Sequence, residues 1–122
     1  MKRSLFFLIT AILSAFAGFV MSFPPNYKVE RHYFIPFIEI SFHHSGGLIF
    51  SLAILNFLVR NHGDSATLKA VLICNLVNHA INTVHDLMAY NQGIIGLESL
   101  PFFISHFFIG GFSLYYLSKI KS

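Results

Sequence analysis

The sequence predicts an all-α integral membrane protein, a four-helix bundle with up-down-up-down topology. Of the 122 residues, 55% are hydrophobic and only 11% are charged, whereas charged residues make up about a quarter of a soluble domain. The hydrophobic residues fall into four segments, and each can cross a hydrocarbon core of about 30 Å, which needs about 20 helical residues. Short loops separate the segments, which favours antiparallel neighbours. The predicted helices cover residues 4–23, 34–59, 66–90 and 98–118 of a single domain, 1–122.

The first two helices have boundaries set by proline. Pro24 and Pro25 stop the first helix, because proline lacks an N–H group and restricts the residue before it. Pro36 falls in the first turn of the second helix, where proline is tolerated.

The last two helices begin at polar residues. Asp64 or Ser65 suits the N-cap of the third helix, and residues 91–93 (Asn-Gln-Gly) end it. Ser99 and Pro101 open the fourth helix as its cap and first-turn proline.

Small residues recur at helical spacing and indicate close packing of helices in a bilayer. They are Ala11, Ser14, Ala15 and Gly18 in the first segment, Gly46 and Gly47 in the second, and Gly110 and Gly111 in the fourth. Packing inside the bundle is the commoner reason for such a pattern, and dimerisation is the alternative.

Charged residues at the helix ends predict that both termini are cytoplasmic. Six basic residues then lie inside and two outside, in agreement with the positive-inside rule. The basic residues form no surface stripe, which argues against nucleic-acid binding. We expect a multi-pass protein of a cell membrane, of the bacterial inner-membrane kind. Residues 1–17 also resemble a cleavable signal peptide, but the apolar run continues to Phe23, so we expect this segment to be retained as a helix.

The third segment carries polar side chains at steps of three and four, so they share one helix face. They are Asn75, Asn78, His79, Asn82, His85 and Asp86. Lipid offers no hydrogen-bond partners, so this face must turn toward other helices or enclosed water.

Other polar groups fall at overlapping depths in the outer half of the membrane, at about 1.5 Å of rise per residue. Together with the polar face of the third segment, which we call the polar stripe, they predict a ligand pocket. Its residues are Glu39, His43, His44, Asn78, His79, Asn82, His85, Asp86 and His106. Neutral imidazoles are metal ligands, and carboxylates support them. His43, His79 and His106 are the candidate ligands of a metal ion or haem, although no HExxH, paired-cysteine or haem-attachment motif is present.

A hydrophobic small molecule such as a quinone, isoprenoid or sterol is the other candidate ligand. Seven phenylalanines would form its wall: Phe37, Phe42, Phe50, Phe102, Phe103, Phe107 and Phe108. A histidine paired with a carboxylate could do acid–base work, and the sequence leaves open whether the protein is an enzyme. The polar groups could instead only fix packing, at about 0.6 kcal/mol per hydrogen bond.

The alternative function is that of an accessory or scaffold subunit. Its polar seam would pack against a larger membrane protein or a second copy of the chain. The two functions differ in assembly. A scaffold subunit should copurify with a partner or as an oligomer, whereas a ligand-binding protein should bind its ligand as a monomer.

Cys74 is the only cysteine of the chain. This excludes an intramolecular disulfide and a CxxC redox pair. It lies among apolar neighbours in the middle of the third helix, which predicts a small packing residue.

Residues 42–48 (FHHSGGL) and 55–61 (LNFLVRN) resemble small bacterial four-helix membrane proteins of the DoxX-like type. In those proteins too, a glycine-rich second helix ends in an arginine and a polar third helix follows. The resemblance spans residues 40–118 in outline and implies a compact four-helix membrane fold. It transfers no catalytic residue, and the histidines of this chain depart from the family pattern.

Overall fold

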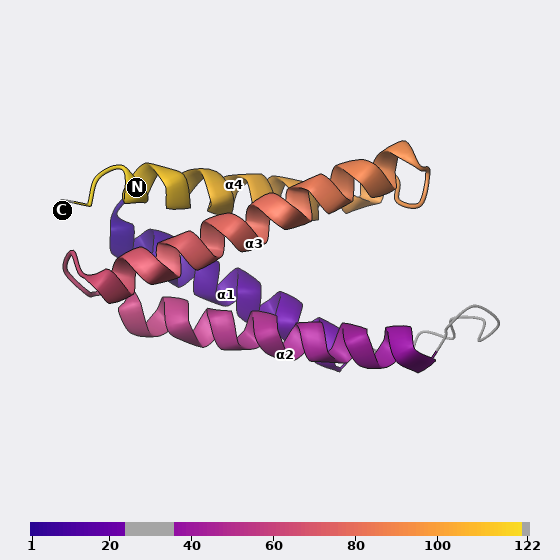
Figure 1. Ribbon diagram of the computed structural model, residues 1–122, viewed down its shortest axis with the longest axis horizontal. Helices are drawn as coiled ribbons and strands as arrows, with labels where there is room; N and C mark the ends of the chain where they lie inside the picture. The colour runs from indigo at the N-terminus through magenta and orange to yellow at the C-terminus, as the bar shows by residue number, and fades with distance from the viewer. Residues whose placement is uncertain (24–35, 121–122) are drawn as a thin grey trace. The chain divides into compact units, whose positions relative to one another are not determined.

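The computed structural model describes residues 1–23 and 36–120 of the protein, and at 36–43 and 98 it describes the backbone alone. These ranges contain four α-helices, one short 3₁₀ helix and no β-strand. The elements are α1 (Arg3–Ser22), α2 (Pro36–Val59), α3 (Ala66–Asn91), η1 (Leu97–Ser99) and α4 (Leu100–Leu117) (Figure 1). The predicted all-α class with four helices is therefore confirmed for this part of the chain.

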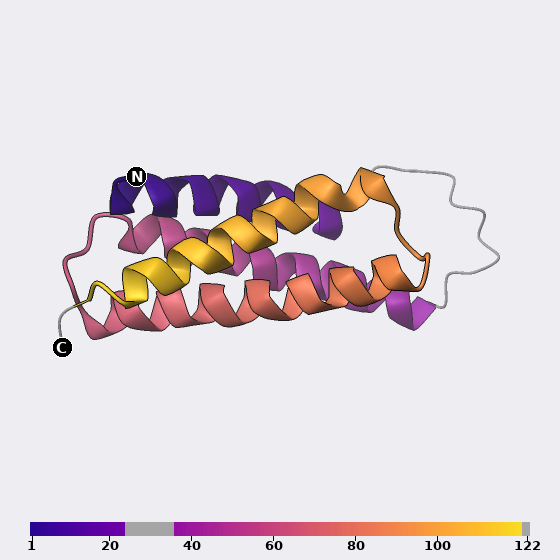
Figure 2. The ribbon, with the colours of Figure 1, turned by 90° about the horizontal axis from the view of Figure 1, so that it is seen from above.

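The chain divides into two compact units, each of which is a helical hairpin. The first unit, Met1–Asn61, pairs α1 with α2, and the second unit, His62–Ser122, pairs α3 with α4. Within each unit the two long helices run antiparallel (Figures 1 and 2). In the second unit, the short connection between α3 and η1 favours this arrangement.

In the first unit, α1 and α2 make a close backbone contact at two glycines. A Cβ atom built on Gly18 would lie 2.7 Å from the backbone nitrogen of Phe50 and 2.8 Å from the carbonyl oxygen of Gly46. A Cβ atom on Gly46 would lie 2.6 Å from the backbone nitrogen of Ser22. Real Cβ atoms do not approach backbone this closely, so both positions need glycine. Gly47, one residue further on, has no such neighbour within 4 Å among the described residues.

The same face of α1 forms the buried side of the first unit. Phe6, Phe7, Thr10, Ala11, Ser14 and Gly18 are buried, at the spacing of one helix face. Three of the four small residues predicted in α1 therefore lie on the packed face, and Ala15 is half-buried.

The start of α3 has the expected serine cap. Ser65 has extended backbone dihedrals, and its Oγ accepts a hydrogen bond from the N–H group of Leu68 at 3.1 Å. This bond satisfies one of the free N–H groups of the first helical turn. Of the two predicted candidates, Ser65 is therefore the N-cap residue.

The end of α3 is formed by Gly93, which has a φ of +70°. The N–H group of Gly93 donates to the carbonyl of Tyr90, and that of Ile94 donates to the carbonyl of Ala89. These two bonds define a Schellman motif, in which glycine adopts the left-handed conformation at low cost. The predicted stop at residues 91–93 is confirmed.

The start of α4 differs from the prediction. Ser99 occupies the N-cap position but makes no capping hydrogen bond with its side chain. Its backbone is already helical because η1 leads directly into α4, and its Oγ donates to the carbonyl of Gly96 at 2.7 Å. A capping serine needs an extended backbone, so the cap prediction for Ser99 is wrong. The first-turn proline, Pro101, is present as predicted.

Two of the described helices, α1 and α4, are long and apolar enough to cross a membrane, judged by length and composition. In α2 the described apolar part runs from His44 to Val59 and is shorter. α3 is long enough to cross a membrane, but its polar stripe lowers its mean hydropathy.

Cys74 lies in α3 but is exposed. The expectation that it packs inside the fold is therefore wrong for the second unit. The buried residues of α3 are instead Leu68, Val71, Leu72, Asn75 and His79.

Candidate functional site

Three ionisable side chains of the second unit meet between α3 and α4. Nδ1 of His79 lies 2.8 Å from Nδ1 of His106, which is hydrogen-bond distance. Nε2 of His106 lies 3.8 Å from Oδ2 of Asp86. The latter distance is in the ion-pair range but is too long for a hydrogen bond. The three groups form a chain in the order Asp86, His106, His79.

Helical spacing on both helices accounts for this meeting. His79 and Asp86 are seven residues apart, two turns along α3, and so lie on one face. On α4, Gly110 follows His106 by one turn and has no side chain. A Cβ atom built on Gly110 would lie 3.6 Å from Cβ of His79, an ordinary contact distance. α4 therefore lies close to α3 beside the histidine pair, and a methyl group at position 110 would also fit there.

The contact between the two Nδ1 atoms constrains the protons of the pair. One Nδ1 must carry a proton and donate, and the other must be bare and accept. When His79 donates, His106 is neutral and its proton sits on Nε2, facing Asp86. When His106 donates, it is either the opposite tautomer or the charged form with protons on both nitrogens.

Two polar atoms of these three side chains have no hydrogen-bond partner among the described residues. They are Nε2 of His79 and Oδ2 of Asp86, and both atoms are buried. Buried polar atoms are rarely left unpaired, because the lost hydration costs free energy. Nε2 of His79 is therefore available to a water molecule or another polar group.

A cavity of about 190 Å³ lies beside Asp86, where the polypeptide passes from α3 through η1 into α4. It is lined by Asp86, Leu87, Tyr90, Ile95, Gly96, Leu97, Ser99, Leu100 and Phe103. Among the side chains that the structure describes, Asp86 is the only charged one in this lining, and most of the rest are aliphatic or aromatic. For comparison, an engineered apolar cavity of about 150 Å³ binds benzene. The cavity therefore suits a molecule of one ring with a small substituent.

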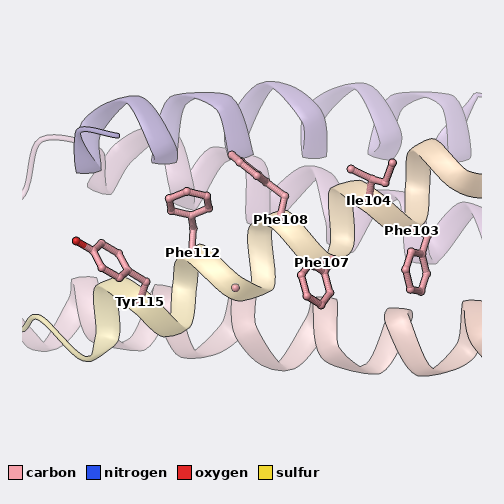
Figure 3. A pocket seen from close by; sticks show the side chains of 7 residues that line it. Phe103, Ile104, Phe107, Phe108, Phe112 and Tyr115 are labelled. Atoms are coloured by element: carbon pink, nitrogen blue, oxygen red, sulfur yellow. The ribbon is translucent and has the colours of Figure 1, made fainter.

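A second, more open hollow of about 520 Å³ runs along α4. Its lining residues are Phe103, Ile104, Phe107, Phe108, Gly111, Phe112 and Tyr115. Figure 3 shows these side chains projecting from successive turns of α4. Three of the seven phenylalanines predicted as a pocket wall, Phe103, Phe107 and Phe108, are among them. The side chains of Phe37 and Phe42 lie outside the described residues.

The other predicted site residues divide into three groups. The side chains of Glu39 and His43 lie outside the described residues, and His44 is exposed on α2. On α3, Asn78 and Asn82 are half-buried, and Nδ2 of Asn82 donates to Oδ1 of Asn78 at 3.5 Å. His85 is exposed, although it is the neighbour of Asp86.

The candidate metal set is not brought together in the part of the chain that the structure describes. No group of three or more His, Cys, Asp or Glu residues there could hold a metal ion. His79 and His106 also face each other directly at 2.8 Å, which leaves no room for an ion between their Nδ1 atoms, since zinc–nitrogen bonds alone are about 2.0–2.1 Å. A set that includes His43 stays a prediction.

Sequence reasoning missed several residues of the site. Gly110, which was predicted only as a packing residue, follows His106 by four residues, so their shared face was a readable signal. The lining residues Ile95 and Leu97 had no such signal, because their position depends on the turn between α3 and α4.

Comparisons with known proteins add no assignment to this geometry. No family model, curated protein or solved structure matches the chain. The resemblance to DoxX-like proteins therefore stays a prediction.

Proposed function

We propose that the protein is a multi-pass membrane protein whose α3–α4 hairpin binds a hydrophobic small molecule beside Asp86. One observation carries the proposal: Asp86 is the one carboxylate among the described side chains of a largely apolar cavity, and it lies beside the pair His106 and His79. Ligand sites commonly combine an apolar lining with a few placed polar groups.

Exposed apolar side chains support the membrane location. Ile73, Val77, Ile81, Val84 and Met88 follow one another at helical spacing along α3 and are 44–54% exposed. Their face is opposite to the polar stripe. Soluble monomers rarely leave an apolar patch of this kind in water, whereas lipid is its natural surroundings.

The distribution of basic residues supports the finer topology within this proposal. Both termini would be cytoplasmic and the helices would alternate in direction, in keeping with the positive-inside rule. The turn between α3 and α4, with the cavity beside Asp86, would then lie toward the outer side of the membrane.

Binding is tested with neopentylbenzene, a neutral molecule of one ring. The full chain, labelled with ¹³C at isoleucine methyl groups, is reconstituted in nanodiscs of zwitterionic lipid. We expect a saturable shift of the Ile95 methyl signal, because Ile95 lines the cavity. Leu100→Trp fills the cavity and should remove the shift. The matched control is Leu114→Trp, on the same helix but outside the cavity lining. Absence of a saturable shift, or equal shifts in both variants, contradicts the proposal.

The second candidate function is that of an accessory or scaffold subunit. The hollow along α4 favours it, because aromatic residues of one helix form most of its lining. Phe107 lines the hollow and Phe102 does not, although both are exposed. Phe107→Ser should dissociate a homo-oligomer or partner complex in mild detergent, and Phe102→Ser should not. A wild-type chain that is monomeric and without a partner rules this function out.

A further inference from the structure

We propose that the molecule bound beside Asp86 is a lipophilic organic cation, for which Asp86 is the counter-ion. This inference rests on the proposed function, because it names the chemical class of ligand for the same cavity. The ligand would be an aromatic or aliphatic amine, or a quaternary ammonium ion, whose apolar part is about the size of one ring.

The charges around the cavity favour a cation. Asp86 is the only charged residue that lines it among the described residues. Lys69 lies 17 residues before Asp86 on α3, about 25 Å away along the helix axis. Lys119 follows the far end of α4. A carboxylate in a largely apolar lining loses hydration and gains from a positive partner, and no described lysine or arginine in the lining supplies one.

The histidine pair leaves this charge available to a ligand. His85 is adjacent in the sequence but exposed, so the imidazole that faces Asp86 is His106. When Nδ1 of His79 donates to Nδ1 of His106, His106 is neutral and presents its Nε2 proton to Asp86. In this state His106 does not neutralise the charge of the carboxylate.

Aromatic groups complete a cation site. Tyr90 and Phe103 line the same cavity from α3 and α4. The face of an aromatic ring attracts ammonium groups, and quaternary ammonium ligands in particular are bound by combinations of rings and carboxylates. A neutral ligand would gain apolar contact with these rings but would leave Asp86 unpaired.

A matched pair of probes isolates the charge. Benzyltrimethylammonium is a permanent cation with no hydrogen to donate, and neopentylbenzene has the same shape without the charge. Dissociation constants for the full chain in zwitterionic nanodiscs are measured from the Ile95 methyl shift and corrected for partition of each probe into lipid. We expect the cation to bind at least about tenfold more tightly.

Variants of Asp86 test the counter-ion. Asp86→Asn should remove the preference for benzyltrimethylammonium and leave the affinity for neopentylbenzene within about twofold, a change too small for loss of a charge pair. Asp86→Glu keeps the charge and should keep the preference. Retained binding of the neutral probe shows that the cavity has folded. If Asp86→Asn binds neither probe, Asp86→Glu decides, because a preference retained there supports the inference and a lost one overturns it.

The outcomes separate this inference from the function on which it rests. Equal or tighter binding of neopentylbenzene by the wild-type chain overturns the cation inference and leaves the proposed function standing. Saturable binding of neither probe overturns both.

Discussion

The contact between α1 and α2 at Gly18 gives the sharpest stability prediction. In Gly18→Ala the new Cβ atom would lie 2.7 Å from the Phe50 nitrogen, about 0.8 Å short of the ~3.5 Å at which such atoms attract best. The obstructing atoms belong to the backbone and cannot rotate away. The two helices must therefore separate by several tenths of an ångström along this contact.

The magnitude follows from the size of that separation. A gap of about 0.5–1 Å forfeits a quarter to a half of the attraction between facing atoms, and overpacking typically costs about 1–3 kcal/mol. Gly47→Ala is the matched control, since Gly47 has open space around its Cβ position. Gly18 lies inside α1 and Gly47 inside α2. Replacing either glycine by alanine therefore gains the same helix propensity, about 1 kcal/mol. We expect Gly18→Ala to be less stable than Gly47→Ala by about 1–3 kcal/mol, or about 5- to 150-fold in the unfolding equilibrium.

The assay measures how α1 packs against α2. Donor and acceptor dyes are attached through Lys2→Cys and Asn61→Cys in a Cys74→Ser background, and energy transfer is followed during an SDS titration in mixed micelles. Gly46→Ala should behave like Gly18→Ala, and the double variant should cost less than the sum, because both residues share one contact. An unfolding midpoint for Gly18→Ala equal to or above that of Gly47→Ala would refute the close approach.

Three further predictions concern the second unit. Ser65→Ala removes the acceptor for the Leu68 N–H group and should lower the stability of the first turn of α3 by about 1 kcal/mol. Hydrogen exchange of the Leu68 amide should then be faster, and an unchanged exchange rate speaks against the cap. Cys74 is exposed in the structure but should resist a water-soluble maleimide in liposomes, because the surrounding lipid keeps the reagent away from the thiol. Labelling as fast as that of a free thiol in water contradicts the membrane location. The ¹⁵N spectrum of the imidazoles should show one protonated and one bare Nδ1 for His79 and His106, and two bare Nδ1 atoms would exclude their hydrogen bond.

Local sequence signals were sufficient where the deciding interaction lies within a few residues. Ser65 caps α3, Gly93 ends it and Pro36 lies in the first turn of α2, as predicted. Ser99 shows the limit of such signals. Its residue type and following proline match a helix start, but η1 before it holds its backbone in a helical conformation, and the hydroxyl turned back to Gly96.

The polar stripe was predictable as one face of a helix, but not the use of each residue in it. Each residue turns the helix by about 100°, so His85 and Asp86 differ in exposure although they are neighbours. The meeting of His79 with His106 further requires the right height and rotation of α4 beside α3. These conditions are not encoded in the spacing along a single helix.

The sequence by itself determined the helical class, the four helices and most of their ends, because period, proline, glycine and capping residues act locally. It also placed the ionisable residues on helix faces. Only the tertiary structure decided that Asp86, His106 and His79 form a chain and that Asp86 lines a cavity. Contacts between helices depend on their rotation, height and distance, and these are settled by packing across the whole α3–α4 hairpin.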